Sequence, residues 1–248
     1  MDTAHSLPRA GVVVTPAPRE RNREHRFFLV MALVCALIAF VGFAPSYYLR
    51  RFTGGEPLTT LVHVHGALAT AWMLLFLTQA ALVSAGRTHI HRRLGVAGAL
   101  LAPLFVAVGY LTAVEGARRG VTPPGGPPPL AFLAVPMGAL LAFTVLAGAG
   151  LWQRRHRDSH KRLMLLATIA VLIPALARFR WFGFGGPPVA IGGSALLVVA
   201  CLAYDRAAYG RVHPAFLWGG LFLLISLPVR FALTRSDGWL RVAEWLTR

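Results

Sequence analysis

The chain has 248 residues, of which 56% are hydrophobic and only 14% charged, and its mean hydropathy is +0.60. This composition excludes an ordinary soluble domain and places the chain in lipid. A net charge of +16 would suggest a nucleic-acid partner for a soluble protein, but the Lys and Arg residues lie in termini, connections and the ends of apolar segments. We therefore expect the lipid bilayer as partner and no nucleic acid.

The first 26 residues are polar, with three prolines and a run of mixed charge, which is typical of a disordered cytoplasmic tail. The apolar stretch that follows is longer than the core of a signal peptide, about 7–15 residues, so we expect a retained first helix. The two cysteines, Cys35 and Cys201, lie in apolar segments without metal-binding spacing. This placement argues against a disulfide framework or a zinc site.

Seven stretches reach the length of about 20 apolar residues that a spanning helix needs. They lie near 27–48, 58–84, 93–115, 130–152, 161–180, 188–204 and 214–234. We expect an all-α, polytopic transmembrane helical bundle over residues 27–234. The sixth stretch is the weakest, because Gly192, Gly193 and Ser194 loosen it, so six spans are the alternative.

Residues 235–248 predict an amphipathic interfacial helix after the bundle. Ser236 is a suitable N-cap, and Trp239, Val242, Ala243 and Leu246 fall on one face, opposite Arg241, Glu244 and Arg248. Such a helix lies on the membrane surface.

The distribution of basic residues predicts the orientation. With the N-terminus inside, 15 of the 25 Lys and Arg residues fall in the tail and around the connections near 85–93, 153–162 and 205–213. Lys and Arg accumulate on the cytoplasmic side, so we expect a multi-pass protein of a bacterial-type inner (plasma) membrane with a cytoplasmic N-terminus.

A histidine followed by basic residues opens three of the spans that run in the same direction. His91-Arg92-Arg93-Leu94 returns as His160-Lys161-Arg162-Leu163, and His213 opens the last span more loosely. A repeated helical hairpin explains this pattern, and so does convergence of short basic junctions in lipid. Neutral imidazole suits heme iron or copper, with Arg92, Arg93 and Arg162 near enough to pair with heme propionates. Alternatively, His91 and His160 lie in the headgroup region without a cofactor.

The second span carries His63 and His65 inside its apolar region, where ionisable groups are costly and suggest function. The two histidines point about 200° apart on a helix. His65, Trp72 and Gln79 are spaced by seven residues and form one stripe, which we expect to face the bundle interior. The alternative is a structural histidine bonded to a neighbouring carbonyl.

Arg178 and Arg230 are predicted at the depth of His65 in the outer leaflet, since each lies about 24–26 Å along its span at 1.5 Å per residue. A pocket lined by these three residues would favour an anion, a quinone carbonyl or heme propionates. Alternatively, both arginines snorkel to the headgroups.

Enzymatic and transport motifs are missing from the sequence. We find no Ser/His/Asp set, paired carboxylates, HExxH motif or phosphate loop, and no carboxylate in the middle of a span. We therefore lean against an enzyme, and a small-molecule carrier is the least favoured class.

These motifs resemble a family of bacterial polytopic membrane proteins of unknown function. The similarity covers roughly residues 60–180 and rests on His65-Gly66, Trp72, Gln79, His91-Arg92-Arg93-Leu94-Gly95 and His160-Lys161-Arg162-Leu163-Met164, where Leu163 replaces an aromatic residue of the family. A more distant resemblance is to b-type membrane cytochromes, which implies heme held between histidines of different helices. This chain lacks an outer-level histidine on a second helix to pair with His63 or His65.

The sequence thus predicts an integral membrane protein of uncharacterised activity with a small-ligand pocket in the outer leaflet. The alternative is a heme- or quinone-linked membrane redox subunit, with b-type heme as its cofactor.

Overall fold

The computed structural model describes residues 18–54, 57–123, 126–179, 183 and 185–248. This part of the chain is helical throughout. Its elements are α1 (Pro18–Phe43), η1 (Ala44–Tyr48), α2 (Arg50–Thr53), α3 (Thr60–Ser84), α4 (Thr88–Arg118), α5 (Pro129–Phe132), α6 (Ala134–Trp152), α7 (Arg157–Ala170), α8 (Ile173–Ala177), α9 (Gly186–Tyr209), α10 (Pro214–Leu233) and α11 (Asp237–Leu246). The predicted all-α fold is confirmed.

Seven helical segments in the described part are long and apolar enough to cross a membrane: Asn22–Tyr48, Thr60–Ser84, Thr88–Arg118, Pro129–Trp152, Arg157–Ala177, Gly186–Tyr209 and Pro214–Leu233. The weak sixth stretch is a continuous helix, so the seven-span prediction holds over the six-span alternative. The first helix begins at Pro18, before the predicted start at residue 27. The rest of the predicted tail, residues 1–17, lies outside the described residues.

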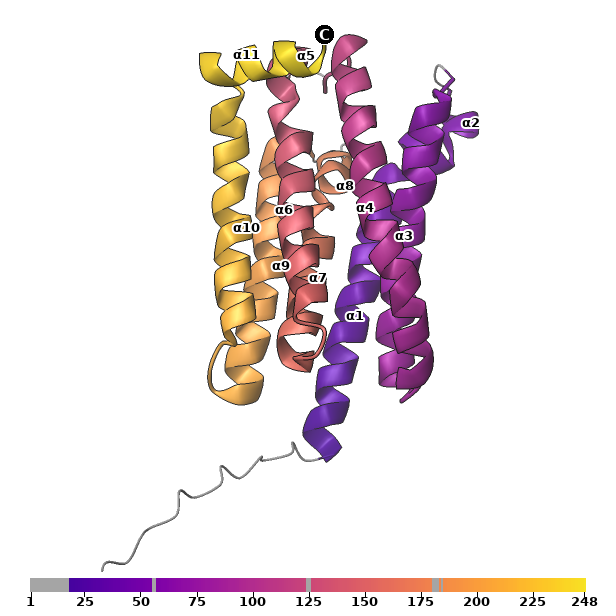
Figure 1. Ribbon diagram of the computed structural model, residues 1–248, viewed down its shortest axis with the longest axis vertical. Coiled ribbons are helices and arrows are strands. Elements are labelled where there is room, and N and C mark those ends of the chain that lie inside the picture. The colour runs from indigo at the N-terminus through magenta and orange to yellow at the C-terminus, as the bar shows by residue number, and fades with distance from the viewer. Residues whose placement is uncertain (1–17, 55–56, 124–125, 180–182, 184) are drawn as a thin grey trace, which may run out of the picture.

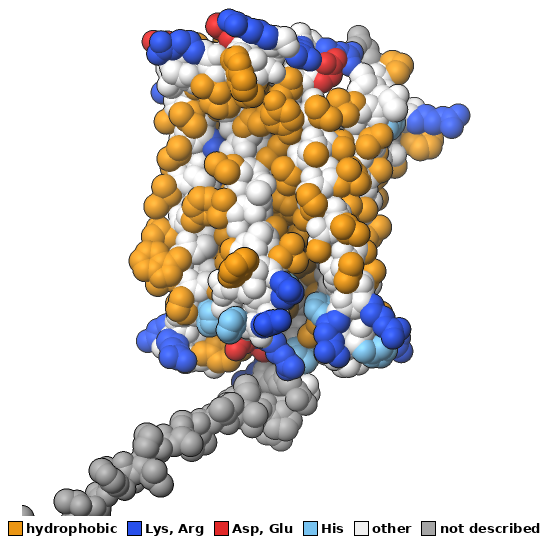
Figure 2. All heavy atoms as spheres, in the orientation of Figure 1, with side chains coloured by type: hydrophobic (Ala, Val, Ile, Leu, Met, Phe, Trp, Pro, Cys, Tyr) orange, Lys and Arg blue, Asp and Glu red, His pale blue; other side chains and the backbone are white. Residues whose placement is uncertain are grey.

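The seven spanning segments lie side by side along the long axis of the molecule (Figure 1). We call the end where α1 begins the lower end, and the end where α11 lies the upper end. Hydrophobic side chains cover the middle of the visible face, and Lys and Arg side chains gather at both ends (Figure 2). Apolar sides with charged ends are what a bilayer requires, and the protein is an integral membrane protein by this criterion.

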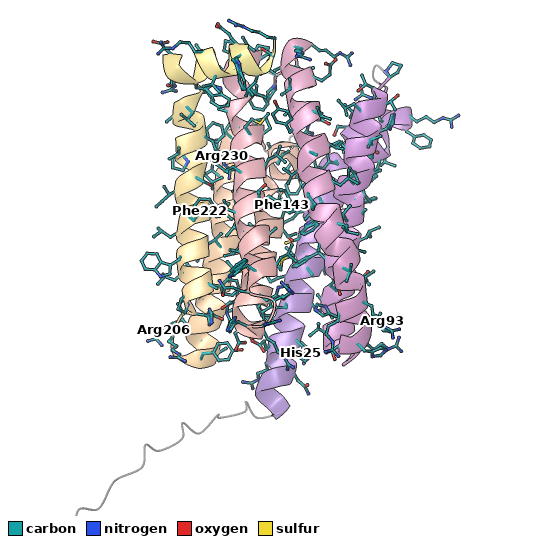
Figure 3. All side chains as sticks on the ribbon, in the orientation of Figure 1. His25, Arg93, Phe143, Arg206, Phe222 and Arg230 are labelled. Carbon is teal, nitrogen blue, oxygen red and sulfur yellow. The ribbon has the colours of Figure 1, made fainter. Side chains whose placement is uncertain are left out.

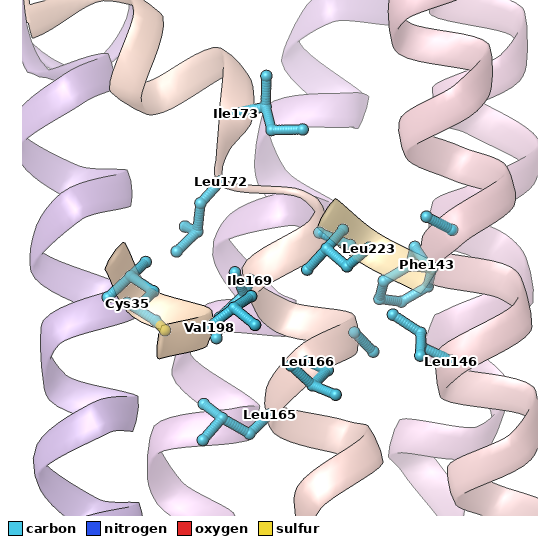
Figure 4. Packing of buried hydrophobic residues seen from close by; sticks show 14 of the residues in the cluster. Cys35, Phe143, Leu146, Leu165, Leu166, Ile169, Leu172, Ile173, Val198 and Leu223 are labelled. Atoms are coloured by element: carbon cyan, nitrogen blue, oxygen red, sulfur yellow. The ribbon is translucent and has the colours of Figure 1, made fainter. Parts of the chain in front are cut away.

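The fifth span is the central element of the bundle and consists of two helices. α7 ends at Ala170 and α8 begins at Ile173, with Pro174 in the first turn of α8. Pro174 has no N–H to continue the hydrogen-bond ladder of α7, which explains the interruption. Leu172 in the break is fully buried, as is Ile169 before it (Figure 4). The break is therefore packed with apolar side chains.

Helix α11 lies across the upper end of the bundle (Figure 1). The Ser236 hydroxyl caps it by accepting from the backbone N–H of Trp239 at 3.4 Å. Ala243 is fully buried, and the Trp239 indole N–H donates to the carbonyl of Leu130 at 3.1 Å. A helix therefore forms after the bundle, with Trp239, Ala243 and Leu246 at least partly buried and Val242 exposed; its position at a membrane interface stays a prediction.

Candidate functional site: a histidine pair at the lower end

Helix α7 brings His160 to the lower end, one turn after its start. Nδ1 of His160 lies 2.8 Å from the carbonyl oxygen of Gly150, in the last turn of α6. A carbonyl only accepts, so Nδ1 carries the proton and donates it to Gly150. The other ring nitrogen, Nε2, then keeps its lone pair. A backbone carbonyl that fixes the tautomer in this way is the usual support of a metal-binding histidine.

Helix α4 brings His91 to the same level from the other side. The ring centroids of His91 and His160 are 6.4 Å apart, and the ring planes meet at 77°. The two residues are therefore neighbours in space, although 69 residues separate them in the chain. In the space-filling view, histidine side chains appear between Lys and Arg side chains along the lower rim (Figure 2).

Two buried polar atoms beside this pair form no hydrogen bond with any described residue. They are Nδ1 of His91 and Oε1 of Gln79. Gln79 belongs to the same site, because its Nε2 atom lies 3.6 Å from the position that a Cβ on Gly95 would occupy, one turn after His91. An unsatisfied buried polar atom costs about 1–3 kcal/mol, so such atoms call for a missing partner.

The predicted stripe on α3, formed by His65, Trp72 and Gln79, faces the bundle interior most clearly at its central residue, Trp72. Trp72 is 3% exposed, and its indole N–H donates to the hydroxyl of Thr168 on α7 at 3.3 Å. Trp72 also packs edge-on against Phe143 of α6. Trp72 thus joins α3 to the central helix, between the levels of His65 and Gln79.

The three residues predicted to line an upper pocket have separate contacts. The His65 ring stacks on Phe105 of α4, at 5.5 Å between centroids. Arg178 lies over the ring of Phe43 at 4.7 Å, and Arg230 packs against Gly138 of α6. No described contact joins His65, Arg178 and Arg230, so the structure gives the predicted pocket no support.

His63 lies on another side of α3 from His65 and is exposed. Its backbone carbonyl accepts from the hydroxyl of Tyr47 at 3.2 Å. His63 contributes to an open depression of about 290 Å³ at the upper end, shared with Tyr47, Tyr48, Arg50, Arg51, Pro57 and Leu58.

A buried ion pair at the lower end was not predicted. Arg162 and Asp205 are 3% and 0% exposed, and the guanidinium donates from both Nε and Nη2 to the carboxylate, at 2.9 and 2.7 Å. Asp205 also accepts from the backbone N–H of His213 at 3.0 Å. This pair corrects the expectation that Arg162 is available for heme propionates, because its carboxylate partner lies within the chain. The signal that could have revealed it is an aspartate in the last turns of an apolar helix.

His213 uses its side chain to cap the N-terminus of α10. Its Nδ1 accepts from the backbone N–H of Ala215 at 3.1 Å, which requires the neutral ring. Burial, followed by the nearby positive charge of Arg162, lowers the pKa of His213 from its ordinary value. The third histidine of the predicted repeat thus has a structural role.

The metal-ligating side chains at the lower end limit which metal could bind there. The described residues contain no group of three or more His, Cys, Asp or Glu side chains placed to hold a metal ion. Two histidines alone do not complete the tetrahedral or octahedral shell of an ordinary metal ion. They do complete the shell of a heme iron, since the porphyrin supplies the four other nitrogens.

Comparison with protein families, with curated proteins and with solved structures finds no match to this chain. The functional argument therefore rests on the residues and their geometry.

Proposed function

We propose that this protein is a b-type heme-binding redox protein of the membrane, in which His91 and His160 would hold the heme iron. The observation that carries the proposal is the 6.4 Å separation of the two rings, with Nδ1 of His160 held by the carbonyl of Gly150. Two imidazoles that each bind one metal through a ring nitrogen have centroids about 6 Å apart, because each metal–nitrogen bond is about 2 Å long and each ring centre lies about 1 Å beyond its nitrogen. The observed separation matches this value.

The surroundings of the pair also favour a bound group. His91 Nδ1 and Gln79 Oε1 are buried without a hydrogen bond to the described residues, while the His91 ring also has a hydrogen bond with the Gln79 backbone, so Nδ1 is the ring nitrogen that would bind a metal. A heme would supply one-electron chemistry here. The protein's contribution would be to hold the imidazole of His160 in one tautomer through the carbonyl of Gly150, to present the ring of His91 beside it, and to exclude water on the side of Trp72, which is 3% exposed.

The basic residues at the lower rim supply partners for heme propionates. Arg92 and Arg93 are exposed and follow His91 directly on α4, and Arg93 is at the lower end in Figure 3. Arg162 is excluded from this role by Asp205. We infer that the propionates would point to the aqueous side through Arg92 and Arg93, where charged groups remain solvated.

We further propose that the lower end faces the cytoplasm of a bacterial-type plasma membrane. The excess of Lys and Arg in the lower connections supports this orientation. Heme would then lie near the cytoplasmic surface, where a soluble or membrane-bound partner such as a quinone exchanges electrons with it.

The visible spectrum of the purified protein tests the proposal. After expression with sufficient heme, the wild-type protein should show a Soret band and, on reduction with dithionite, a sharp α band. His91→Ala and His160→Ala should each lose most of the bound heme. His89→Ala and His156→Ala are matched controls, because these exposed histidines lie two residues before His91 and four before His160. Intact bands in both ligand variants would exclude this pair.

A further inference from the structure

The upper half of the bundle contains a buried guanidinium with almost no partner. Arg230 is 2% exposed, and among the described residues only the hydroxyl of Ser226 accepts from it, at 2.9 Å from Nη2. Its Nε and Nη1 atoms are buried without a hydrogen bond. A buried charge without a counterion is among the costliest arrangements in a protein, so this site calls for an anionic partner.

A glycine on the neighbouring helix makes room for Arg230. A Cβ on Gly138 of α6 would lie 2.5 Å from Cγ of Arg230 and 2.9 Å from its Nε. The arginine side chain therefore lies flat against the α6 backbone, at the seam between α6 and α10 (Figure 3). An arginine pointing freely to the headgroups would not need this glycine. The expectation that Arg230 snorkels is thus wrong, because the side chain is enclosed.

The depth of Arg230 indicates which anion reaches it. Arg230 lies three residues before the end of α10 at Leu233, about 5 Å along the helix axis. Helix α11 lies just above (Figure 1), and its exposed residues Arg241 and Glu244 mark the level of the membrane surface. The backbone of Arg230 is thus within one turn of the upper end of α10, and its guanidinium points back toward Ser226, one turn deeper.

We propose that the seam between α6 and α10, beneath α11, binds the phosphate of an anionic membrane phospholipid through Arg230. Guanidinium and phosphate are matched in shape and charge, and Nε and Nη1 form the two-pronged donor edge that such a group takes. Because the Arg230 side chain is enclosed and directed toward Ser226, binding would require it to turn toward α11. This site lies at the opposite end of the bundle from the histidine pair and is independent of it.

Thermal unfolding in detergent with added lipid tests this proposal, followed through the fluorescence of the chain's six tryptophans. We expect phosphatidylglycerol to raise the wild-type midpoint by about 5 °C more than diacylglycerol with the same acyl chains. Arg230→Met should fold, since it removes an unpaired buried charge, and should lose this difference. Arg230→Lys should keep part of it, because the charge remains without the two-pronged edge.

Three further arms decide the outcome. Arg235→Gln, at an exposed arginine just beyond α10, should respond as the wild type does. Gly138→Ala should weaken the response, because the added methyl group displaces the Arg230 side chain. Equal protection by phosphatidylglycerol in the wild type and in Arg230→Met would overturn the proposal. Equal protection of the wild type by inorganic phosphate alone would overturn the assignment to a lipid.

Discussion

Removing the carboxylate of Asp205 should be the most damaging single change at the lower end. Asp205→Ala leaves the guanidinium of Arg162 buried at 3% exposure without its two charged hydrogen bonds. It also removes the acceptor for the backbone N–H of His213. Breaking one side of a buried ion pair costs about 3–5 kcal/mol, so we expect a loss of this size in the free energy of unfolding.

A double variant, compared with the single variants Arg162→Met and Asp205→Leu, separates the pair from the packing around it. Arg162→Met combined with Asp205→Leu should recover most of the loss, because an apolar pair of similar volume carries no desolvation penalty. Lys161→Met is the matched control. The ion pairs of Lys161 with Glu24 and Asp158 are partly exposed and should contribute less than about 1 kcal/mol.

The assay is reversible unfolding in mixed micelles of dodecyl maltoside and sodium dodecyl sulfate. The fraction of detergent at the midpoint, read by tryptophan fluorescence, gives the differences between variants. The reasoning about Asp205 would be refuted if the free energy of unfolding of Asp205→Ala were within about 1 kcal/mol of the wild-type value.

Three smaller predictions follow from close contacts, caps and pH. Gly42→Ala should lower the midpoint of unfolding by an amount equivalent to about 1–3 kcal/mol, because the added Cβ would lie 2.4 Å from the backbone oxygen of Ala175. Gly148→Ala is the control and should be neutral or stabilising, because its Cβ would meet no atom within 4 Å. Equal effects of the two substitutions would contradict this prediction. Ser236→Ala should speed amide hydrogen exchange in α11 through loss of about 1 kcal/mol of capping, and unchanged exchange would contradict it. The pKa of His213 is lowered in the folded protein, so the contribution of its neutral ring to stability is intact above the ordinary value of 6.5 and declines as pH falls below 6.5, where the unfolded chain takes up the proton first. Melting temperatures measured from pH 8 to 5 should fall less in His213→Asn, which keeps a capping side chain but does not titrate. An identical fall in both proteins would count against this role of His213.

The spans and the surface helix could be predicted because their causes are local. Each span is an apolar run long enough to cross a bilayer, and Ser236 caps α11 from within three residues. The start of α1 was predicted too late because the polar residues from Pro18 onward form a helical extension that hydropathy alone does not reveal.

The ion pair of Arg162 and Asp205 could not be predicted in the same way. The two residues are 43 positions apart, and Arg162 stands in a basic junction that the positive-inside pattern already explains, whereas Asp205 lies in the last turns of an apolar helix. Only the packing of α7 against α9 shows that the two side chains are buried together.

The three residues predicted to share an upper pocket, His65, Arg178 and Arg230, show a second limit of prediction from sequence. Depth along a helix follows from counting residues, but the direction in which a side chain points depends on how each helix is rotated in the bundle. His65 meets α4, Arg178 meets α1 and Arg230 meets α6, so similar predicted depths did not produce one site. His91 and His160 were predicted at one depth as well, and there the helices also turn the two rings toward each other.

The most direct test of the histidine-pair proposal is electron paramagnetic resonance of the oxidised protein, with the heme-to-chain ratio measured on the same sample. Axial ligation by His91 and His160 predicts one heme per chain and a low-spin ferric signal, because two imidazoles give a strong ligand field. That signal should be lost in His91→Ala and in His160→Ala. A heme-free wild-type protein, or a low-spin signal that survives both substitutions, would contradict the proposal.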